Sequence, residues 1–470
     1  MPPALWKTEA DADRIARYEQ HTHLYKGNFT KVWPSLKPID GSFVVPMNDA
    51  RVVVDPIANL LFREKIDLLA ENESPETQAA IDGLVRRNHL HALFKDQAAW
   101  TCVKGDSVFL ISGTEESGVT IEDVDPRYFF GEFDPLNTKR LVRARFAYPL
   151  THDKQLFVYQ QVHEVIDGEG VIRHQLFLGE EDPYSGEGRL IERVPLTTIP
   201  RFAELPRIET TGVDEILVVH ALNARCPGDP YGVSDYTESL KSKFRARTQL
   251  ATQRRAVTAK HMEPIITMPK EVLRALKEQS GDKLTIKKES LKLIGLAPNQ
   301  EGPKAMSWDA QLQYAKDEDA ILFKQILEEA KIAPALLGAS SGGIEGGETG
   351  RANVMKLQVS LGLAHTKQQF WTPAIEDLMR KAQKLDNALR PEGQRYEVSP
   401  INVIWKDGLF SDGLTDAQKE QVLVEAGLSS RESAIQRLTG WTQEKVREEM
   451  RRIDEDDRHS ATQLDPFLGE

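Results

Sequence analysis

Short apolar stretches separated by turn residues fill the chain between Val119 and His220. The stretches are rich in valine, isoleucine, leucine and aromatic residues, and glycine, proline, aspartate and asparagine lie between them. This alternation is typical of β-strands joined by turns. The clearest stretches are residues 142–148, 156–166, 171–178 and 216–220. This part of the chain is therefore predicted to be mostly β-sheet.

Helical patterns dominate the residues that precede this β-rich region. Residues 1–30 are typical of a polar helix, and Pro56, a favourable first residue, predicts the start of a helix that continues through residues 57–69. Another helix is predicted over residues 76–99. Residues 102–112 predict a β-hairpin or strand pair, because apolar residues flank Lys104-Gly-Asp106. Residues 1–230 are therefore predicted to form one α+β domain.

Long helices are predicted in the second half of the chain. The first runs from Ser234, a suitable N-cap, to His261, and would span roughly 40 Å at 1.5 Å per residue. The second covers residues 309–332, capped by Ser307 or Asp309, and stops at Pro334. The third covers residues 351–385, with bends at Gly362 and Pro373.

Smaller elements are predicted between and after the long helices. Residues 263–306 form a compact insertion, with strands at 265–268, 284–286 and 291–294 and a helix at 269–278. A strand follows at residues 396–405. Thr415 with Gln418, and Ser429 with Glu432, match the capping box of two short helices. Thr442 is predicted to cap the last helix, and the tail beyond residue 459 is predicted to be disordered.

Composition excludes several classes of protein. A chain of 470 residues has room for roughly three domains. The net charge of −12 argues against a nucleic-acid binder with a generally basic surface, although basic patches remain compatible with it. Two cysteines form neither a zinc cluster nor a disulfide framework. We expect no signal peptide and no membrane span.

One basic run stands out against this acidic background. Between Ser239 and Met262 the predicted helix carries seven basic residues and no acidic one. Two interpretations stay open: a solvated basic face, or a face turned toward DNA or an acidic neighbouring surface. The insertion is basic too. The basic residues that we single out in the two segments are Lys241, Lys243, Arg245, Arg247, Arg254, Arg255, Lys260, Lys283, Lys287, Lys288 and Lys292.

A glycine-rich loop lies between the second and third long helices. The spacing of Gly342, Gly347 and Thr349 matches a phosphate-binding P-loop, but Glu348 replaces the lysine that would neutralise phosphate, and no buried strand precedes the loop. The letters Gly338-Ala-Ser340-Ser-Gly342 also match a nucleophile elbow without its strand–turn–helix context. Glycines that provide flexibility explain the loop better. A surface loop between two core helices, or a loop that lines or moves something, both remain open.

The sequence contains only weak candidates for metal-binding or catalytic residues. The pairs His21/His23 and His89/His91 are spaced i,i+2, which separates them on a helix. The acidic cluster 317–319 is interpreted as a solvated face, and Glu122, Asp123 and Asp125 before Pro126 as a turn. We therefore predict no catalytic residues, no metal site and no cofactor.

Five stretches, in order and at matching spacing, resemble the portal proteins of tailed bacteriophages, in the branch seen in siphophages of Bacillus. Each motif is weak alone, but together they cover nearly the whole chain. They are Val52–Phe62, Val103–Leu110, Ile121–Phe129, Val218–Asn223 followed by Tyr231–Asp235, and Leu428–Ile435 with Leu438–Trp441 and Val446–Ile453.

The resemblance implies an α+β portal fold with named parts. Residues 1–232 would be the wing, 233–262 and 308–337 the two stem helices, and 263–307 the clip between them. Residues 338–350 would be the tunnel loop, 351–412 the long helix and return to the wing, 413–458 the crown and 459–470 a tail. The tunnel loop would place Ser340, Ser341, Gly342, Gly343, Ile344, Glu345, Gly346, Gly347, Glu348, Thr349 and Arg351 at the channel.

The resemblance also implies a function and partners. The protein would be no enzyme and would form a homo-dodecameric ring at one capsid vertex of the virion, as a conduit for double-stranded DNA without sequence specificity. Its partners would be the large terminase, a head–tail adaptor, and scaffolding and major capsid proteins. Two alternatives stay open: a phosphate- or nucleotide-handling enzyme that uses the loop Gly342–Thr349, and another oligomeric phage head component without a DNA channel.

Overall fold

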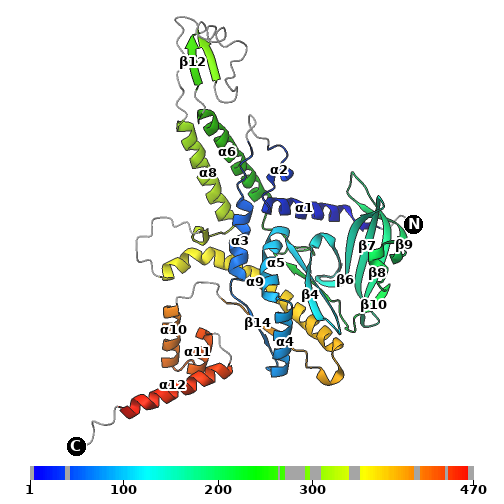
Figure 1. Ribbon diagram of the computed structural model, residues 1–470, viewed down its shortest axis with the longest axis vertical. Helices are drawn as coiled ribbons and strands as arrows, with labels where there is room; N and C mark the ends of the chain where they lie inside the picture. Colours follow the sequence, from blue (N-terminus) through cyan, green and yellow to red (C-terminus); the bar gives the residue numbers. More distant parts are fainter. Residues whose placement is uncertain are drawn as a thin grey trace, which may run out of the picture. The chain divides into compact units, whose positions relative to one another are not determined.

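The computed structural model describes residues 5–36, 43–262, 265–269, 292–296, 309–337, 350–406, 413–439 and 443–463. The chain divides into two compact units, residues 1–406 and 407–470. Helices and sheets are both abundant, which confirms the predicted α+β class (Figure 1). No described helix combines the length and apolarity that crossing a bilayer requires.

The first helices begin where their caps and apolar faces dictate. α1 (Glu9–Tyr25) starts at Thr8, whose hydroxyl and backbone N–H form a capping box with Asp11. After α2 (Phe29–Val32) comes α3 (Asp49–Leu61), which contains Pro56 in its interior. The predicted start at Pro56 was wrong, because the buried face of α3 already begins at Ala50 and continues through Ile57.

The next segment contains two helices and a strand where one helix and a hairpin were predicted. α4 (Pro75–Arg87) and α5 (Leu90–Lys104) are separated at His89, which has a left-handed backbone with φ +48°. α5 continues through Cys102 and ends at Gly105, with φ +98°, and β3 (Asp106–Thr114) follows. The predicted hairpin at 102–112 was therefore wrong: the glycine ends a helix instead of turning a strand.

The predicted β-rich region is confirmed as two antiparallel sheets. The larger sheet has the strand order β1-β9-β8-β7-β6-β5, and β10 pairs with β8. The smaller has the order β11-β3-β4. The strand bounds are β1 (Leu5–Lys7), β4 (Gly118–Val124), β5 (Phe129–Asp134), β6 (Asn137–His152), β7 (Gln155–Ile166), β8 (Glu169–Glu181), β9 (Gly188–Val194), β10 (Ile208–Thr210) and β11 (Val218–Leu222).

A helical hairpin and a long helix follow. α6 (Glu238–Met262) packs against α8 (Asp309–Glu329) (Figure 1). Thr237, not Ser234, caps α6, because its hydroxyl accepts from the N–H of Leu240. The hydroxyl of Ser234 instead donates to the carbonyl of Val103 at the end of α5. α8 ends three residues earlier than predicted. α9 (Gly350–Leu389) is longer than predicted and contains Pro373, and the expected bends stay a prediction.

The insertion is described only at two strands. β12 (Ile265–Pro269) and β13 (Lys292–Leu296) pair in parallel, close to two of the predicted strands. The predicted elements at 269–278 and 284–286 lie outside the described residues, apart from Pro269.

The strand after α9 is shorter than the predicted strand at residues 396–405. β14 (Ile401–Ile404) pairs with β2 (Asp67–Ala70), but residues 396–399 are not strand. The reason is that side chains of α9 form hydrogen bonds with the backbone N–H groups that a neighbouring strand would otherwise bind. Asn387 accepts from the N–H of Tyr396, and Gln383 accepts from the N–H of Ser399.

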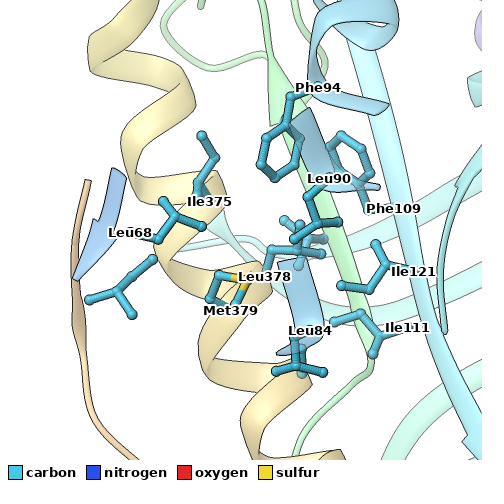
Figure 2. Close-up of a cluster of buried hydrophobic side chains, with 14 of the residues drawn as sticks. Leu68, Leu84, Leu90, Phe94, Phe109, Ile111, Ile121, Ile375, Leu378 and Met379 are labelled. Atoms are coloured by element: carbon cyan, nitrogen blue, oxygen red, sulfur yellow. The ribbon is translucent and has the colours of Figure 1, made fainter. Parts of the chain in front are cut away.

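Aromatic and aliphatic side chains of α4, α5, α9 and the smaller sheet form the main core (Figure 2). Trp371 of α9 contacts Phe62, Phe94 and Phe109 edge-on, with ring centroids 5.1 to 6.2 Å apart. Such contacts join elements far apart in sequence. The long helix α9 is thereby fixed to the N-terminal half of the chain.

The second unit consists of α10 (Gly413–Glu425), α11 (Arg431–Thr439) and α12 (Gln443–Gln463). Ser430, not Ser429, caps α11 through the N–H of Ser433, so the second predicted box was displaced by one residue. Thr415 lies inside α10 instead of before it. α12 extends past the predicted end at residue 458, and Thr442 lies outside the described residues.

Candidate functional site

The basic helix α6 is held mainly by acidic residues of its own chain. Arg247 is buried and lies between two other helices. Its guanidinium donates to Asp319 of α8, at 2.8 Å from Nε to Oδ1, and to Asp49 of α3. The guanidinium also lies over the ring of Phe323, 4.5 Å from its centroid. Asp319 is thus a partner of α6, and its interpretation as part of a solvated face was wrong.

Asp49 is the least satisfied member of this cluster. Its Oδ1 accepts from Arg247, but its Oδ2 is buried without a hydrogen-bond partner. Burial raises the pKa of Asp49 to about 6, because it outweighs the attraction of Arg247, and nearby Asp319 adds to the rise. The cluster therefore carries a carboxyl group that gains a proton in mildly acidic solution.

A second ionic contact joins the same two helices at the base of the hairpin. Glu329, at the end of α8, accepts from Thr237, Ser239 and Lys243 of α6. Partial burial opposes ionisation, but these hydrogen bonds hold the pKa of Glu329 below its ordinary value. α6 and α8 are therefore connected at two levels along their length.

Most other predicted basic residues of α6 also have partners. Lys241 is buried and donates to Gln20, 3.0 Å away, and pairs with Glu238. Arg254 lies 3.9 Å from Asp319. Arg245 is exposed and donates to Ser35, and Arg255 is exposed. The interpretation as a wholly solvated basic face was therefore wrong for Lys241 and Arg247.

The side chains of the remaining predicted site residues lie outside the part of the protein that the structure describes. The side chains of Lys260, Lys292 and Arg351 lie outside the described residues, as do Lys283, Lys287 and Lys288. The tunnel-loop residues Ser340 to Thr349 also lie outside them. Their roles stay predictions.

The entry to α6 is fixed by a buried lysine that the sequence reasoning missed. Lys367 of α9 is 3 % exposed and donates to Asn223, at 2.5 Å, and to both oxygens of Asp235, at 2.9 Å. Burial opposes its charge, but the Cys102 sulfur and Asp235 raise its pKa above the ordinary value. Asn223 and Asp235 belong to a quoted motif, whereas Lys367 lies in an ordinary helical pattern that gave no signal.

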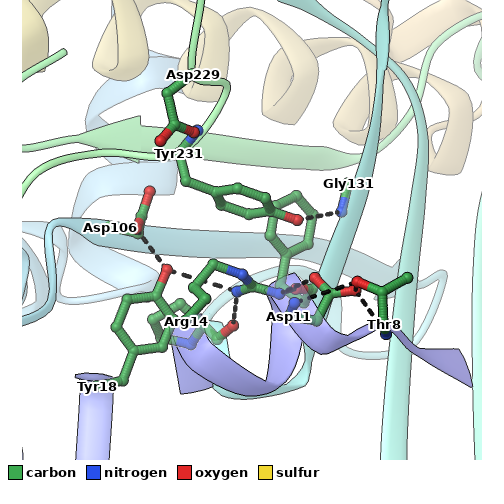
Figure 3. A network of polar contacts seen from close by, with 10 residues as sticks. Thr8, Asp11, Arg14, Tyr18, Asp106, Gly131, Asp229 and Tyr231 are labelled. Atoms are coloured by element: carbon green, nitrogen blue, oxygen red, sulfur yellow. Dashed lines mark hydrogen bonds and ion pairs between the residues drawn. The ribbon is translucent and has the colours of Figure 1, made fainter. Parts of the chain in front are cut away.

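A second buried network fixes the strand that follows Gly105 (Figure 3). Asp106 is 1 % exposed and accepts from Tyr18, from the imidazole of His220 and from the N–H of Gly232, at 2.5 to 2.7 Å. Arg14 donates to Asp11 and Tyr18, and its guanidinium lies 4.1 Å from the centroid of the Tyr231 ring. The motif at Asp106 therefore serves to join α1, the small sheet and the loop before α6.

The predicted turn before Pro126 is confirmed only at Asp125, because Glu122 and Asp123 belong to strand β4. Asp125 caps a 3-10 turn (Pro126–Tyr128) by accepting from the N–H of Arg127, and Lys104 pairs with it at 2.9 Å. Within the described ranges, no group of three or more potential metal ligands comes together.

Residues 244–463 match the family model described as "Phage portal protein, SPP1 Gp6-like". Over these residues, slightly less than half of the chain, the sequence is similar to the phage portal family. The match begins inside α6 and includes α8, α9 and the three helices of the second unit. The resemblance expected from the five motifs is thereby confirmed for this part of the chain.

Two further comparisons complete the picture. A solved structure titled "Neck of empty GTA particle computed with C6 symmetry" is similar over 86 % of this chain and 95 % of that chain, at 11 % identity and a TM-score of 0.36. A score this low supports no argument about fold or function. No curated protein matches this chain.

Proposed function

We propose that this portal-family protein forms a homo-dodecameric ring at one capsid vertex of a tailed bacteriophage, as a non-enzymatic conduit for double-stranded DNA. The observation that carries the proposal is the family match, which spans the helical hairpin α6–α8 and the long helix α9. In this proposal residues 1–232 are the wing, α6 and α8 the stem, residues 263–307 the clip and 413–458 the crown.

Exposed apolar side chains support an assembly of several copies. Tyr314 and Ile321 on α8 are 75 % and 52 % exposed, and Met355 and Val359 on α9 are 62 % and 59 % exposed. Exposed large apolar side chains are a feature of protein interfaces when they form a common surface. Neighbouring copies in a closed ring would cover them.

The charge distribution of the stem supports loose, sequence-independent contact with DNA. Lys241 and Arg247 are buried and bind other residues of the chain. In the described part of α6, the exposed basic residues are therefore Arg245 and Arg255. A few phosphate contacts carry no sequence information and let DNA slide. In this proposal the glycine-rich loop would follow a DNA helix whose symmetry differs from that of the ring.

The proposed partners follow from the same role. Large terminase would supply ATP hydrolysis and dock at the clip, a head–tail adaptor would later replace it, and scaffolding and major capsid proteins would surround the wing. The alternative of a nucleotide site at Gly342–Thr349 gains no support, because Glu348 occupies the position of the required lysine.

The native mass of the purified protein, measured by light scattering together with negative-stain top views, tests the proposal. We expect a ring of about twelve copies with a central hole, closed by cyclic symmetry. A protein that remains monomeric or dimeric even when its scaffolding protein is present would contradict the proposal. A closed ring without a DNA-sized hole would favour another head component.

A further inference from the structure

A groove lies between the hairpin β5–β6, strand β11 and the long helix α9. Its volume is 1130 Å³. The walls include Val142 and Val165 of the large sheet, Leu222 of β11 and Phe370 and Pro373 of α9. Val142 and Val165 are 51 % and 42 % exposed, so the groove presents apolar side chains that the chain itself does not cover.

One wall of the groove is an unpaired strand edge. Strand β11 pairs with β3 on one side, and no described strand pairs with its other side. The N–H of Ile111 donates to the carbonyl of Leu217, and the N–H of Asn223 donates to the carbonyl of Gly105. Odd-numbered residues of this strand therefore face β3, and by alternation Val218, His220 and Leu222 turn their peptide groups to the open side.

A hydrogen bond to one of these residues agrees with this direction. Lys381 of α9 donates to the carbonyl of Val218 at 2.8 Å, from the side opposite β3. The peptide groups of His220 and Leu222 have no such partner among the described residues, and both residues line the groove. An edge of this kind accepts an extended peptide as an additional strand.

The charges at the groove favour an acidic occupant. The acidic residues that line the groove are already paired within the chain: Asp214 with Lys384, Glu215 with Arg380 and Lys384, and Asp377 with Lys381. Lys139, Arg140 and Arg225 also line the groove and are at least partly exposed. Among the described residues, Arg225 donates to the hydroxyl of Thr138 and forms no ion pair, and Arg140 lies 3.9 Å from Asp134.

We propose that this groove binds an extended, acidic peptide segment of a partner protein, which adds to the open edge of β11. Apolar side chains at alternate positions of the peptide contact Val142, Val165 and Phe370. Acidic side chains pair with Arg140 and Arg225. The backbone of the peptide bonds to the peptide groups of His220 and Leu222. The proposal does not rest on the ring, because it uses none of the residues that support the assembly of several copies.

A peptide array tests the chemistry of the occupant. Full-length protein is incubated with an array of random hexapeptides, and the bound sequences are read out. We expect enrichment of acidic residues together with aliphatic or aromatic residues at alternate positions. Binders without acidic enrichment, or no binders, would overturn the proposal.

Backbone methylation of the best binder tests strand addition. N-methylation removes a donor and blocks close approach, so we expect about tenfold or greater loss of affinity at every second position only. The positions between serve as matched controls, because their N–H groups face away. Fluorescence anisotropy gives the affinities, and equal sensitivity at neighbouring positions would overturn strand addition.

Two further readouts locate the peptide on the protein. Hydrogen exchange should slow at the amides of His220 and Leu222 when the peptide binds. The variant R140E/R225E should bind at least about tenfold more weakly, since each reversal replaces attraction by repulsion. The control is Lys154→Glu, an exposed change at the β6–β7 turn outside the groove. Equal affinity of both variants would place the peptide elsewhere and overturn the proposal.

Discussion

Lys367 shows how a single charge joins distant segments. It connects α9 to Asn223 at the end of β11 and to Asp235 at the entry to α6, and only 3 % of its surface is exposed. A buried lysine is tolerated when its three donors find acceptors and its charge finds a counter-charge. Arg247 plays the matching part between α3, α6 and α8.

Replacement of Lys367 by methionine should destabilise the first unit by about 3 kcal/mol, because it leaves the carboxylate of Asp235 without its partner in a mostly buried site. Urea unfolding followed by circular dichroism measures the change. The matched control is Lys384→Met, which removes the better-exposed pair with Asp214 and should cost about 1 kcal/mol or less. The double variant K367M/D235N should recover part of the loss, and a loss equal to the sum of the single changes would contradict this account.

Asp49 should make the stability of the first unit depend on pH. Its folded pKa of about 6 lies above the ordinary 3.8, so the folded state holds the proton more tightly than the unfolded chain. The stabilising contribution is therefore fully present below 3.8 and is lost as pH rises through 6. Relative to the variant Asp49→Asn, the unsubstituted protein should lose on the order of 3 kcal/mol between about pH 4 and about pH 7.

The comparison of the two proteins by urea unfolding at several pH values isolates this residue from the other titrating groups. A difference between them that is the same at every pH would show that Asp49 is ionised throughout, held by Arg247.

At the scale of elements, close approach of two backbone segments decides where α6 begins. Gly105 ends α5 with φ +98°, and a Cβ there would lie 2.7 Å from the carbonyl oxygen of Gly232. A Cβ on Gly232 would overlap the carbonyl of Gly105. The loop that leads to Thr237 passes this point, so the two glycines set the path of the chain into α6.

The variant Gly232→Ala should destabilise the fold by about 2 kcal/mol or more, because the backbone of Gly105 has to move away. Gly83→Ala is the control. It lies within α4 with no atom near its absent Cβ, and should stabilise the protein by about 0.5 to 1 kcal/mol. Thermal unfolding of both variants checks this, and an unchanged melting temperature for the first would contradict the close approach.

At the scale of the whole molecule, the division into two units predicts separate stability. Along the chain, β14 and Trp405 are the last parts that pack into the main core of the first unit. The second unit begins at residue 407. The first residues of the second unit, 407–412, lie outside the described residues.

A protein that ends at residue 406 should therefore unfold in urea with the same midpoint as the first unit of the full chain. A protein that ends at residue 389 loses β14, Tyr396 and Trp405, and should be destabilised by about 3 kcal/mol or more. Tryptophan fluorescence measures both midpoints, and a lower midpoint for the protein that ends at residue 406 would show that the second unit stabilises the first.

The sequence by itself determined the elements whose pattern is local. The strands between Val119 and His220, the helix at the N-terminus, the three long helices and the portal resemblance were predicted from spacing and motif order, because alternation and helical periodicity are properties of neighbouring residues. Errors came where a local signal had two meanings. Pro56 suits a first turn but lies inside α3, and Gly105 suits a hairpin but ends α5.

Only the tertiary structure decided which charges are partners. Arg247 and Asp319 were both interpreted from their own helices, as a basic run and an acidic cluster, although they form one buried contact. Lys367 gave no signal, because its partners lie more than a hundred residues away in the chain. The open edge of β11 likewise exists only because β3 covers one side and no described strand covers the other. Pairing across such distances depends on the assembled fold, and no local pattern of residue types encodes it.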